Sequence, residues 1–336
     1  MVNVGIVGLG WWGVTLIKSV HRISDRIRFV HAVARDPVSK QEIAQRYGLG
    51  LSPTLAEMLK NPAVEAVVLA TPHSLHRAEV EQVAAAGKPV FCEKPLTLTA
   101  ADAVAAVGAA RKAGTLLAVG HNRRFLPGLL EMKRMVKAGE LGELLHVEGH
   151  FSNQNSSSAF APWRADAEES PAGGMTGTGI HVLDAFVSLL GPVRSVYARF
   201  VSRKPAPGPL DTLSVLLQFE NGATGTLACV RATPRYWRSH LFGSTRSAEL
   251  LREDTLVVHH PDGAPATRQT FPNVDTLRLE LEAFADAVEG VRPYPIGDAD
   301  MVATVAAFDA ICRSVKSGRT EFVAVAEQGS PALRSG

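Results

Sequence analysis

The sequence predicts an α/β protein with a doubly wound parallel sheet in its first third and a mostly antiparallel sheet further along the chain. Up to about residue 120, short continuous apolar runs alternate with helical periodicity, which is typical of a parallel sheet covered on both faces. After about residue 190, strand-like runs follow one another without helices between them, which favours antiparallel pairing. The 336 residues exceed the size at which one hydrophobic core usually stops growing, so two domains are expected.

The elements of the first third follow from hydrophobic periodicity. Buried strands are expected at the short aliphatic runs Val4–Val7, Phe29–Ala34, Val64–Ala70, Val90–Cys92 and Leu116–Val119. Helices are expected at Thr15–Ile23, Lys40–Tyr47, His76–Ala86 and Ala100–Ala113. Right-handed crossovers between parallel strands would place these helices on both faces of the sheet.

The pattern changes beyond residue 120. Helices are expected at Leu129–Ala138, Ile180–Leu190, Leu277–Glu289 and Met301–Ser317. Strands are expected at Val193–Val201, Thr212–Glu220, Ala223–Cys229, His240–Gly243 and Thr255–His259. Two segments rich in Ser, Asn or Gly, Ser152–Ser158 and Gly173–Gly179, are expected to be loops. Asn221-Gly222 predicts a tight hairpin turn between two of the strands.

The composition argues against several classes of partner. The formal net charge is +2 with no long run of Lys and Arg, so neither nucleic acid nor an anionic membrane is an expected partner. No apolar run reaches the roughly 18 residues of a membrane helix. Met1–Val7 is typical of a first strand, not of a signal peptide. Cys92, Cys229 and Cys312 show no CxxC or zinc spacing, which indicates reduced thiols and a cytoplasmic location.

A glycine-rich loop follows the first predicted strand directly. Gly8-Leu9-Gly10-Trp11-Trp12-Gly13 is a complete G-x-G-x-x-G that opens a helix, the context in which this pattern is informative. The first glycine permits the tight turn, the second lets a pyrophosphate approach the backbone, and the third lets helix and strand pack closely. The amides at the helix N-terminus then face the phosphates. These six residues predict a dinucleotide site.

The end of the second strand indicates which dinucleotide binds. An acidic residue there would bind a ribose 2′-hydroxyl, whereas a nearby arginine accommodates a 2′-phosphate. The sequence reads Ala34-Arg35-Asp36, with the arginine next to the strand tip and the carboxylate one position further. The expected cofactor is therefore NADP or NAD, with NADP slightly favoured through Arg35, and NAD left open through Asp36.

Further motifs point from fold to family. They are Ala70-Thr71-Pro72-His73-Ser74-Leu75-His76, Cys92-Glu93-Lys94-Pro95-Leu96, the run from Gly120 to Pro127, Trp163-Arg164, Gly179-Ile180-His181-Val182-Leu183-Asp184 and the run from Glu280 to Ala285. Together with the glycine loop they resemble the glucose–fructose oxidoreductase / inositol dehydrogenase / MocA (Gfo/Idh/MocA) family over nearly the whole chain. Glu-Lys-Pro combined with Gly-x-His-x-x-Asp is quite specific for it.

The resemblance implies an N-terminal Rossmann domain, residues 1–122, and a C-terminal α/β domain for substrate binding and oligomerisation, residues 123–336. The second domain would contain an open, mostly antiparallel sheet. Members use NAD or NADP to oxidise or reduce sugars, polyols and related cyclic compounds, so a small molecule of that kind is the expected substrate. Because an exposed sheet face must be covered, a homodimer or homotetramer through the C-terminal sheet is expected.

Lys94 and His181 are the expected catalytic residues. Hydride transfer at a carbinol carbon needs a group that takes the hydroxyl proton and a cation or donor that stabilises the alkoxide. Lys94 ends a parallel strand, where open sheets bind ligands, and its family counterpart lies between nicotinamide and substrate. His181 stands in the first turn of a helix, whose N-terminus should keep the ring neutral. Pro95 is expected to make its turn rigid, with a cis bond as one possibility.

The resemblance also assigns the other site residues. The cofactor site is expected to include Thr71, Pro72, His76, Glu93 and Lys94. The substrate site is expected to include Arg123, Trp163, Arg164 and His181. Arg123 could bind a carboxylate or several hydroxyls bidentately, and it alternates with His121 after a strand, so the two should share a face. Core packing remains the alternative for Trp163.

One position departs from the family pattern. Many members carry an aspartate four residues before the histidine, where this chain has Gly177. Asp184, one helical turn after His181, could interact with the ring instead. The loss motivates an alternative function, a cofactor-binding regulator or redox sensor with little or no turnover. His73 and His76 are spaced as metal ligands can be, but a third ligand is missing, so no metal is expected.

Overall fold

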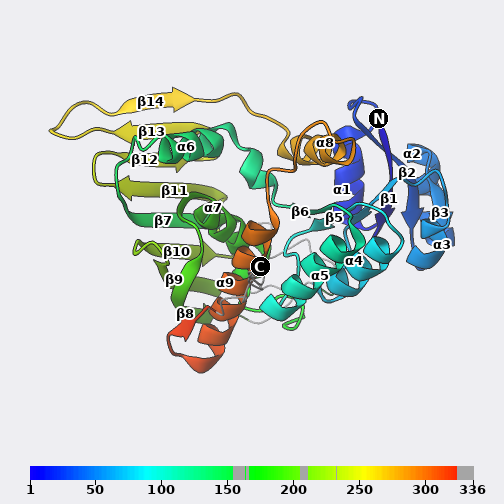
Figure 1. The fold of residues 1–336 in the computed structure, drawn as a ribbon. Coiled ribbons are helices and arrows are strands. Elements are labelled where there is room, and N and C mark those ends of the chain that lie inside the picture. The colour runs from blue at the N-terminus through cyan, green and yellow to red at the C-terminus, as the bar shows by residue number, and fades with distance from the viewer. Residues whose placement is uncertain (154–162, 164–165, 205–210, 232, 324–336) are drawn as a thin grey trace, which may run out of the picture.

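The computed structural model describes residues 1–153, 163, 166–204, 211–231 and 233–323. A smaller parallel sheet lies on one side of the molecule and a larger open sheet on the other (Figure 1). The predicted fold class is confirmed. Within the described ranges, no helix is long and apolar enough to cross a membrane.

The parallel sheet has six strands in the described part of the chain, in the order β3-β2-β1-β4-β5-β6. The strands are β1 (Val2–Val7), β2 (Ile27–Val33), β3 (Gly50–Ser52), β4 (Ala66–Leu69), β5 (Val90–Glu93) and β6 (Leu117–Gly120). The helices between them are α1 (Trp11–Val20), α2 (Gln41–Tyr47), α3 (Leu55–Leu59), α4 (His76–Ala85) and α5 (Ala100–Ala113). The strand order reverses between β1 and β4, so the crevice at their carboxyl ends is where such a sheet binds ligands.

The second sheet has nine strands within the described residues, in the order β14-β13-β12-β11-β7-β10-β9-β8-β15. They are β7 (Leu144–Ser152), β8 (Val193–Ser202), β9 (Asp211–Phe219), β10 (Thr224–Val230), β11 (Tyr236–Gly243), β12 (Ser247–Leu251), β13 (Thr255–His259), β14 (Thr267–Thr270) and β15 (Glu321–Phe322). The β10–β7 pair is parallel, and the other pairs are antiparallel. The sheet is therefore mostly antiparallel, as predicted.

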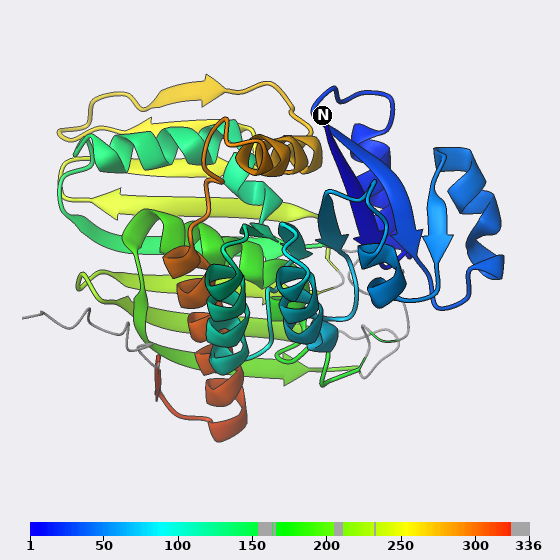
Figure 2. The ribbon, with the colours of Figure 1, turned by 45° about the vertical axis from the view of Figure 1, so that its right-hand side comes forward.

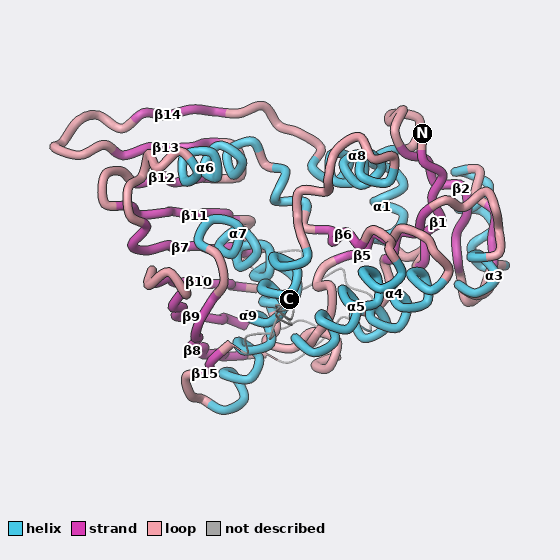
Figure 3. The backbone as a smooth tube through the Cα atoms, viewed as in Figure 1, coloured by secondary structure: helices cyan, strands magenta, loops and turns pink. Residues whose placement is uncertain are grey.

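Three helices cover one face of this large sheet, as Figures 1 to 3 show: α6 (Pro127–Lys137), α7 (Ile180–Leu190) and α9 (Asp298–Ser317). Burial alternates along β9, so Val215 lies in the core with these helices while Leu216 is 57% exposed on the other face. The predicted hairpin at Asn221-Gly222 joins β9 to β10, and Gly222 takes a positive φ of 90°.

The glycine-rich segment before α7 is helical, which corrects the predicted loop at Gly173–Gly179. Met175–Gly179 forms a π-helical turn that runs directly into α7. The hydroxyls of Thr176 and Thr178 donate to the carbonyl oxygens of Pro171 and Gly174 at 2.6 and 2.8 Å, which satisfies acceptors that a loop would leave to water. Composition alone does not reveal such local bonds.

The predicted loop at Ser152–Ser158 also begins later than expected. Ser152 is the last residue of β7, and Asn153 forms a bridge with Arg231. The rest of that segment lies outside the described residues.

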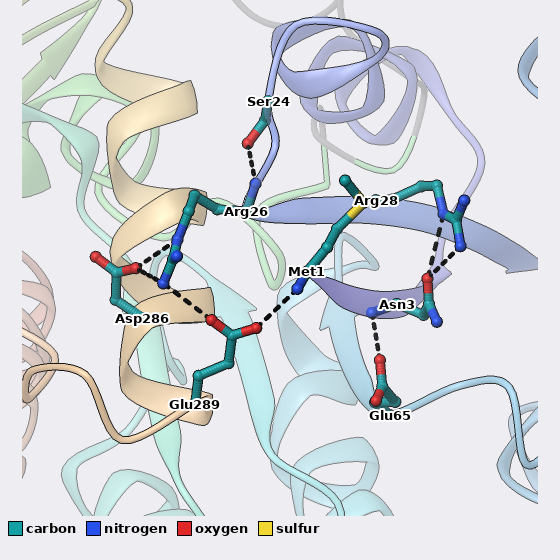
Figure 4. A network of polar contacts seen from close by, with 8 residues as sticks. All are labelled: Met1, Asn3, Ser24, Arg26, Arg28, Glu65, Asp286 and Glu289. Atoms are coloured by element: carbon teal, nitrogen blue, oxygen red, sulfur yellow. Dashed lines mark hydrogen bonds and ion pairs between the residues drawn. The ribbon is translucent and has the colours of Figure 1, made fainter.

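Helix α8 (Thr276–Val288) packs with the parallel sheet although it lies late in the chain. Leu281 and Phe284 belong to the same hydrophobic cluster as β1, β4 and β5. Figure 4 shows the polar contacts at its end: the Arg26 guanidinium donates to Asp286 at 2.8 Å and to Glu289 at 2.9 Å. The domain division after residue 122 stays a prediction, and α8 brings residues near 280 back to the nucleotide-binding half.

Candidate active site

A cleft with about 1020 Å³ of empty space, including its open mouth, lies at the carboxyl ends of the parallel strands and reaches the second sheet. The predicted site residues that line it are Trp11, Trp12, Thr71, Glu93, Lys94, Arg123 and His181. Gly177 and Arg231 also line it. Residues predicted separately as a cofactor site and a substrate site thus meet in one cleft.

The glycine loop has the shape that a dinucleotide requires. Gly8 has a φ of +99°, and a Cβ there would collide with the carbonyl oxygen of Ala70. A Cβ at Gly13 would collide with the carbonyl oxygen of Gly8, so α1 and β1 pack as closely as the motif predicts. A Cβ at Gly10 would meet no atom within 4 Å, and no side chain caps α1 at that residue. The open space beside the first amides of α1 fits a pyrophosphate.

The two tryptophans of the loop stand at the mouth of the cleft. The Trp11 side chain is 68% exposed, and its ring centroid lies 5.4 Å from that of Trp12. Trp12 is half-buried, and its Nε1 is buried without a hydrogen-bond partner among the described residues. A buried donor without a protein partner is costly unless a ligand or water accepts from it. Both side chains line the cleft, and Leu9 between the glycines of the loop is buried.

Lys94 connects the two halves of the cleft. It follows β5, and its Nζ donates to the carbonyl oxygen of Gly177 at 2.7 Å, across 83 positions of the chain. The Lys94–Pro95 peptide bond is cis, the possibility that the sequence raised. The ammonium group thus lies where the parallel strands end and where the segment leading to His181 begins.

His181 is buried in the wall of the cleft. Its Nδ1 has no hydrogen-bond partner among the described residues. Burial holds the pKa of the imidazole well below its ordinary value, and the charges of Lys94 and Arg123 lower it further. The predicted neutral ring is thus supported, but the predicted cause is corrected. The π-helical turn precedes α7, so His181 does not lie at a free helix N-terminus.

A buried charged network lies behind His181, and its centre, Arg124, was missed. The Arg124 guanidinium binds Asp184 at 2.6 and 2.9 Å and Asp300 at 3.0 Å. The His121 ring meets the His181 ring edge to face at 6.1 Å, and its Nε2 lies 3.8 Å from Asp184. Asp184 therefore contacts Arg124 and His121. The sequence had instead suggested, from helical spacing, that Asp184 interacts with His181.

Arg123 lies in the cleft, with its guanidinium 5.3 Å from the centre of the Phe151 ring. Its Nε donates to Glu253 at 3.1 Å, a contact across 130 positions that the sequence did not predict. Asn122–Phe125 is a 3-10 helix, so the expectation that His121 and Arg123 share a strand-like face is wrong. Of the two adjacent arginines, Arg123 lines the cleft and Arg124 lies in the buried network.

Glu280 is a further residue that sequence reasoning did not single out. It comes from α8, is fully buried, and neither carboxyl oxygen has a hydrogen-bond partner among the described residues. Burial raises the pKa of this carboxyl well above its ordinary value, and the nearby Glu93 carboxyl raises it further. The Glu280 carboxyl therefore holds its proton more tightly than an exposed glutamate does, and Lys94 and Arg123 lie near enough to oppose this shift.

Two predicted cofactor residues, Thr71 and His76, hold the loops behind the cleft together. The Thr71 hydroxyl donates to Glu79 at 2.5 Å, and burial raises the pKa of that carboxyl to about 7. His76 is fully buried, with its ring nitrogens 2.9 Å from the Pro95 carbonyl oxygen and 3.1 Å from that of Thr71. Pro72 lies between these loops and is half-buried.

The remaining predicted residues lie at the edges. Arg35 is exposed just beyond β2. Trp163 packs edge to face on His73 at 5.1 Å, outside the cleft lining, and Arg164 lies outside the described residues. Arg231 lines the cleft and pairs with Asp211 at 3.2 Å. Among the described residues, no group of three or more His, Cys, Asp or Glu is arranged to hold a metal ion.

The doubly wound sheet with its open glycine loop and the cleft with Lys94 and His181 define a dinucleotide-dependent oxidoreductase. The family models agree. Residues 2–121 match the model described as "Oxidoreductase family, NAD-binding Rossmann fold", and residues 129–249 match the "GFO/IDH/MocA C-terminal domain". The chain belongs to the Gfo/Idh/MocA oxidoreductase family. The predicted family, fold and oxidoreductase class are confirmed, and the regulator alternative finds no support.

The proteins similar to this chain include dehydrogenases and a hydratase. Inositol 2-dehydrogenase 2 of Saccharopolyspora erythraea is 31% identical over 355 aligned residues, which cover 99% of this chain and 98% of that protein. The 2,7-anhydro-N-acetylneuraminate hydratase of Escherichia coli is 29% identical over 233 residues, which cover 68% of this chain but only 61% of the hydratase. Levoglucosan dehydrogenase, solved with NADH and levoglucosan, superposes with a TM-score of 0.85 over 96% of this chain and 99% of that one. At 22% identity it shows the shared fold.

Proposed function

We propose that the protein transfers hydride between NAD(P) and a CH–OH or C=O carbon of a sugar, polyol or related cyclic compound. The observation that supports this most directly is the meeting of Lys94 and His181 in one cleft, at the carboxyl ends of the parallel strands. They come from different halves of the chain, and the bond from Lys94 Nζ to the Gly177 carbonyl joins the two. The name of the inositol dehydrogenase relative supports the substrate class.

The residues of the cleft fit such a cofactor. Gly10 leaves room beside the α1 amides for the pyrophosphate, and the buried Nε1 of Trp12 offers a donor inside the cleft. The bound nicotinamide ring supplies the hydride acceptor or donor. The Lys94 ammonium stabilises negative charge on the substrate oxygen as the C–H bond breaks, because a fixed cation in a partly buried site needs no reorganisation.

His181 is suited to take the hydroxyl proton. Its ring is neutral at pH 7 because burial and the charges of Lys94 and Arg123 lower its pKa. The same charges make the resulting imidazolium acidic, so the proton must leave the ring readily. The His121 ring packs edge to face on the His181 ring, and its Nε2 lies 3.8 Å from Asp184.

The predicted preference for NADP stays a proposal and gains one supporting contact. The Asp36 carboxylate accepts the backbone N–H groups of Val38 and Ser39 at 3.1 and 3.3 Å. That carboxylate is engaged in its own turn, whereas Arg35 is exposed beside it. A 2′-phosphate is the ligand that an exposed arginine at this strand end accommodates.

Two finer expectations also stand as proposals. A homodimer or homotetramer would cover the face of the large sheet where Leu216 is 57% and Val201 52% exposed. Light scattering measures the oligomeric state of the wild type and of Leu216→Glu, which places a charge on this face. A monomeric wild type would refute the proposed oligomer. A cytoplasmic location is proposed from Cys92, Cys229 and Cys312, all buried and free.

The test of the proposed function is hydride transfer. The protein with NAD or NADP is offered cyclic polyols and sugars, and reduced nicotinamide is followed by absorbance. Lys94→Met is expected to lower kcat roughly 10² to 10³-fold, and His181→Asn roughly 10² to 10⁴-fold. Lys112→Met, an exposed change on α5, is the matched control. Tight cofactor binding without any exchange across the panel would favour a regulator and overturn the proposal.

A further inference from the structure

An open space in the cleft lies directly over Gly177. A Cβ built on this residue would meet no atom within 4 Å, although the residue lines the cleft. Its carbonyl accepts from Lys94 Nζ at 2.7 Å, so the space adjoins a cationic side chain. The backbone of Gly177 has no positive φ, so the glycine is not required there by its turn. Because Gly177 has no side chain, the cleft is open at this position.

Three cationic side chains, Lys94, Arg123 and Arg231, line the cleft that contains this space, as does the Glu93 carboxyl. Arg123 is bonded to Glu253 and Arg231 is paired with Asp211. After burial, the strongest influences on the His181 ring are the charges of Lys94 and Arg123, and both oppose its protonation. Burial raises the pKa of the nearby Glu280 carboxyl, which favours its protonated form. Lys94 and Arg123 would both attract an anion in this space, although Glu253 shares the charge of Arg123.

We propose that the substrate carries a carboxylate, bound over Gly177 by Lys94 and the Arg123 guanidinium, so that the substrate is an acidic sugar or polyol and not a neutral one. This rests on the proposed function, whose substrate class it narrows. The Arg123 Nε already donates to Glu253 and its Nη1 to Asn122, so the ligand carboxylate would accept from the remaining N–H groups of the guanidinium. Charge-assisted bonds of this kind are about twice as strong as neutral ones. The bound anion would also offset the charges that oppose protonation of His181 during the reaction.

Binding to the NADH-loaded protein provides the first test. D-glucuronate and D-galacturonate are compared by calorimetry with D-glucose and D-galactose, which differ from them at one carbon. We expect each uronate to bind about tenfold tighter than its neutral partner, as one added charge-assisted bond provides, with an advantage that shrinks in high salt. Equal or weaker binding of the uronates would overturn the inference. If glucose 6-phosphate binds more tightly than glucuronate, the site recognises a phosphate and not a carboxylate, and the inference is overturned as well.

A matched pair of variants tests the position. Gly177→Asp places a carboxylate in the space, and Gly177→Asn places a neutral side chain of the same size there. We expect Gly177→Asp to abolish the uronate preference and Gly177→Asn to keep most of it, because only the first competes for Lys94 and repels the ligand. Equal effects of the two variants would refute electrostatic recognition. Unchanged NADH affinity and melting temperature show that both variants are folded.

Hydride transfer separates this inference from the function on which it rests. If neutral polyols such as myo-inositol are oxidised and bind at least as tightly as the uronates, the inference fails and the proposed function stands. If the uronates bind with the expected preference but no hydride is exchanged, the carboxylate site stands and the proposed activity fails. If neither class binds, both are refuted.

Discussion

Asp184→Asn is expected to destabilise the protein by about 3 kcal/mol at pH 7, because it leaves a buried arginine without its main partner. The side chains of Arg124 and Asp184 are 4% and 1% exposed and share two hydrogen bonds. Removing one member of such a pair costs roughly 3 to 5 kcal/mol. Asp300 still contacts Arg124 at 3.0 Å, and the asparagine oxygen can still accept a bond, so the lower end of this range applies.

Urea unfolding followed by tryptophan fluorescence measures this change, since Trp237 lies in the core of the second sheet. Asp300→Asn is the matched control. Its side chain is 35% exposed, so its loss should cost about 1 kcal/mol or less. Replacing Arg124 and Asp184 together by Met and Leu should cost less than Asp184→Asn alone, because no charge is then left buried.

The pH dependence gives a second readout. Burial has the largest single effect on the pKa of Asp184 and raises it, but the charges of Arg124 and His121 and the hydrogen bonds from Arg124 and Thr304 together hold the pKa below its ordinary value. The stability that the wild type gains over Asp184→Asn is therefore fully present above the unfolded pKa of about 3.9 and is lost as the pH falls through the folded value. A difference below about 1 kcal/mol at pH 7, or equal losses for Asp184→Asn and Asp300→Asn, would refute the reasoning.

Other predictions concern the cofactor, the pH profile and the contact between α8 and the parallel sheet. Arg35→Ala should lower the ratio of NADPH to NADH affinity about tenfold in a fluorescence titration, while exposed Arg46→Ala leaves it unchanged; an unaltered ratio for Arg35→Ala would exclude the 2′-phosphate contact. The pKa of His181 lies well below 6.5, so protonation of this ring should not lower kcat/KM for oxidation between pH 8 and 6.5. The value should fall only in more acidic solution. A decline near pH 7, as for an ordinary imidazole, would contradict this assignment. Asp286→Ala should cost about 2 kcal/mol in thermal or urea unfolding, because its 7% exposed carboxylate holds Arg26 and Arg292, and a loss under 0.5 kcal/mol would refute that role.

The parts of the fold that the sequence predicts are those in which local chemistry decides. Helix α5 has the predicted bounds Ala100–Ala113, because Thr99 caps its first turn and Gly114 ends it in a left-handed conformation. The glycine loop forms as expected for the same reason: Gly8 and Gly13 are required by contacts within a few residues or with the neighbouring strand. Such features depend on short stretches whose residue types leave few alternatives.

The missed elements are short or polar. Strand β3, Gly50–Ser52, has three residues, too few for any periodicity to show. Strand β7, Leu144–Ser152, carries two histidines, a glutamate and a glycine, yet it lies near the middle of the large sheet between β11 and β10. Its place is set by tertiary pairing, which overrides the weak local preference of its residues for a strand.

The candidate site divides in the same way. Lys94 and His181 stand in motifs, so the sequence singled them out. Glu253 and Glu280 stand in none, and they reach Arg123 and the Glu93 carboxyl only because β12, β13 and α8 fold back on distant parts of the chain. Partners separated by more than a hundred positions leave no local trace in one sequence.

Several buried polar atoms in or near the cleft have no protein partner among the described residues, although others, such as Trp237 Nε1 and Ser239 Oγ, lie on β11 of the second sheet. Trp12 Nε1, His121 Nδ1, His181 Nδ1 and both Glu280 carboxyl oxygens are buried without a hydrogen-bond partner among the described residues. Each such group costs roughly 1 to 3 kcal/mol unless a ligand or water pairs with it. A bound dinucleotide and a hydroxylated or acidic substrate offer the oxygens and N–H groups that these atoms lack. Burial also serves the chemistry of the site, because it lowers the pKa of His181 and keeps that ring neutral. Exclusion of water strengthens the effect of the Lys94 charge on negative charge that develops at the substrate oxygen.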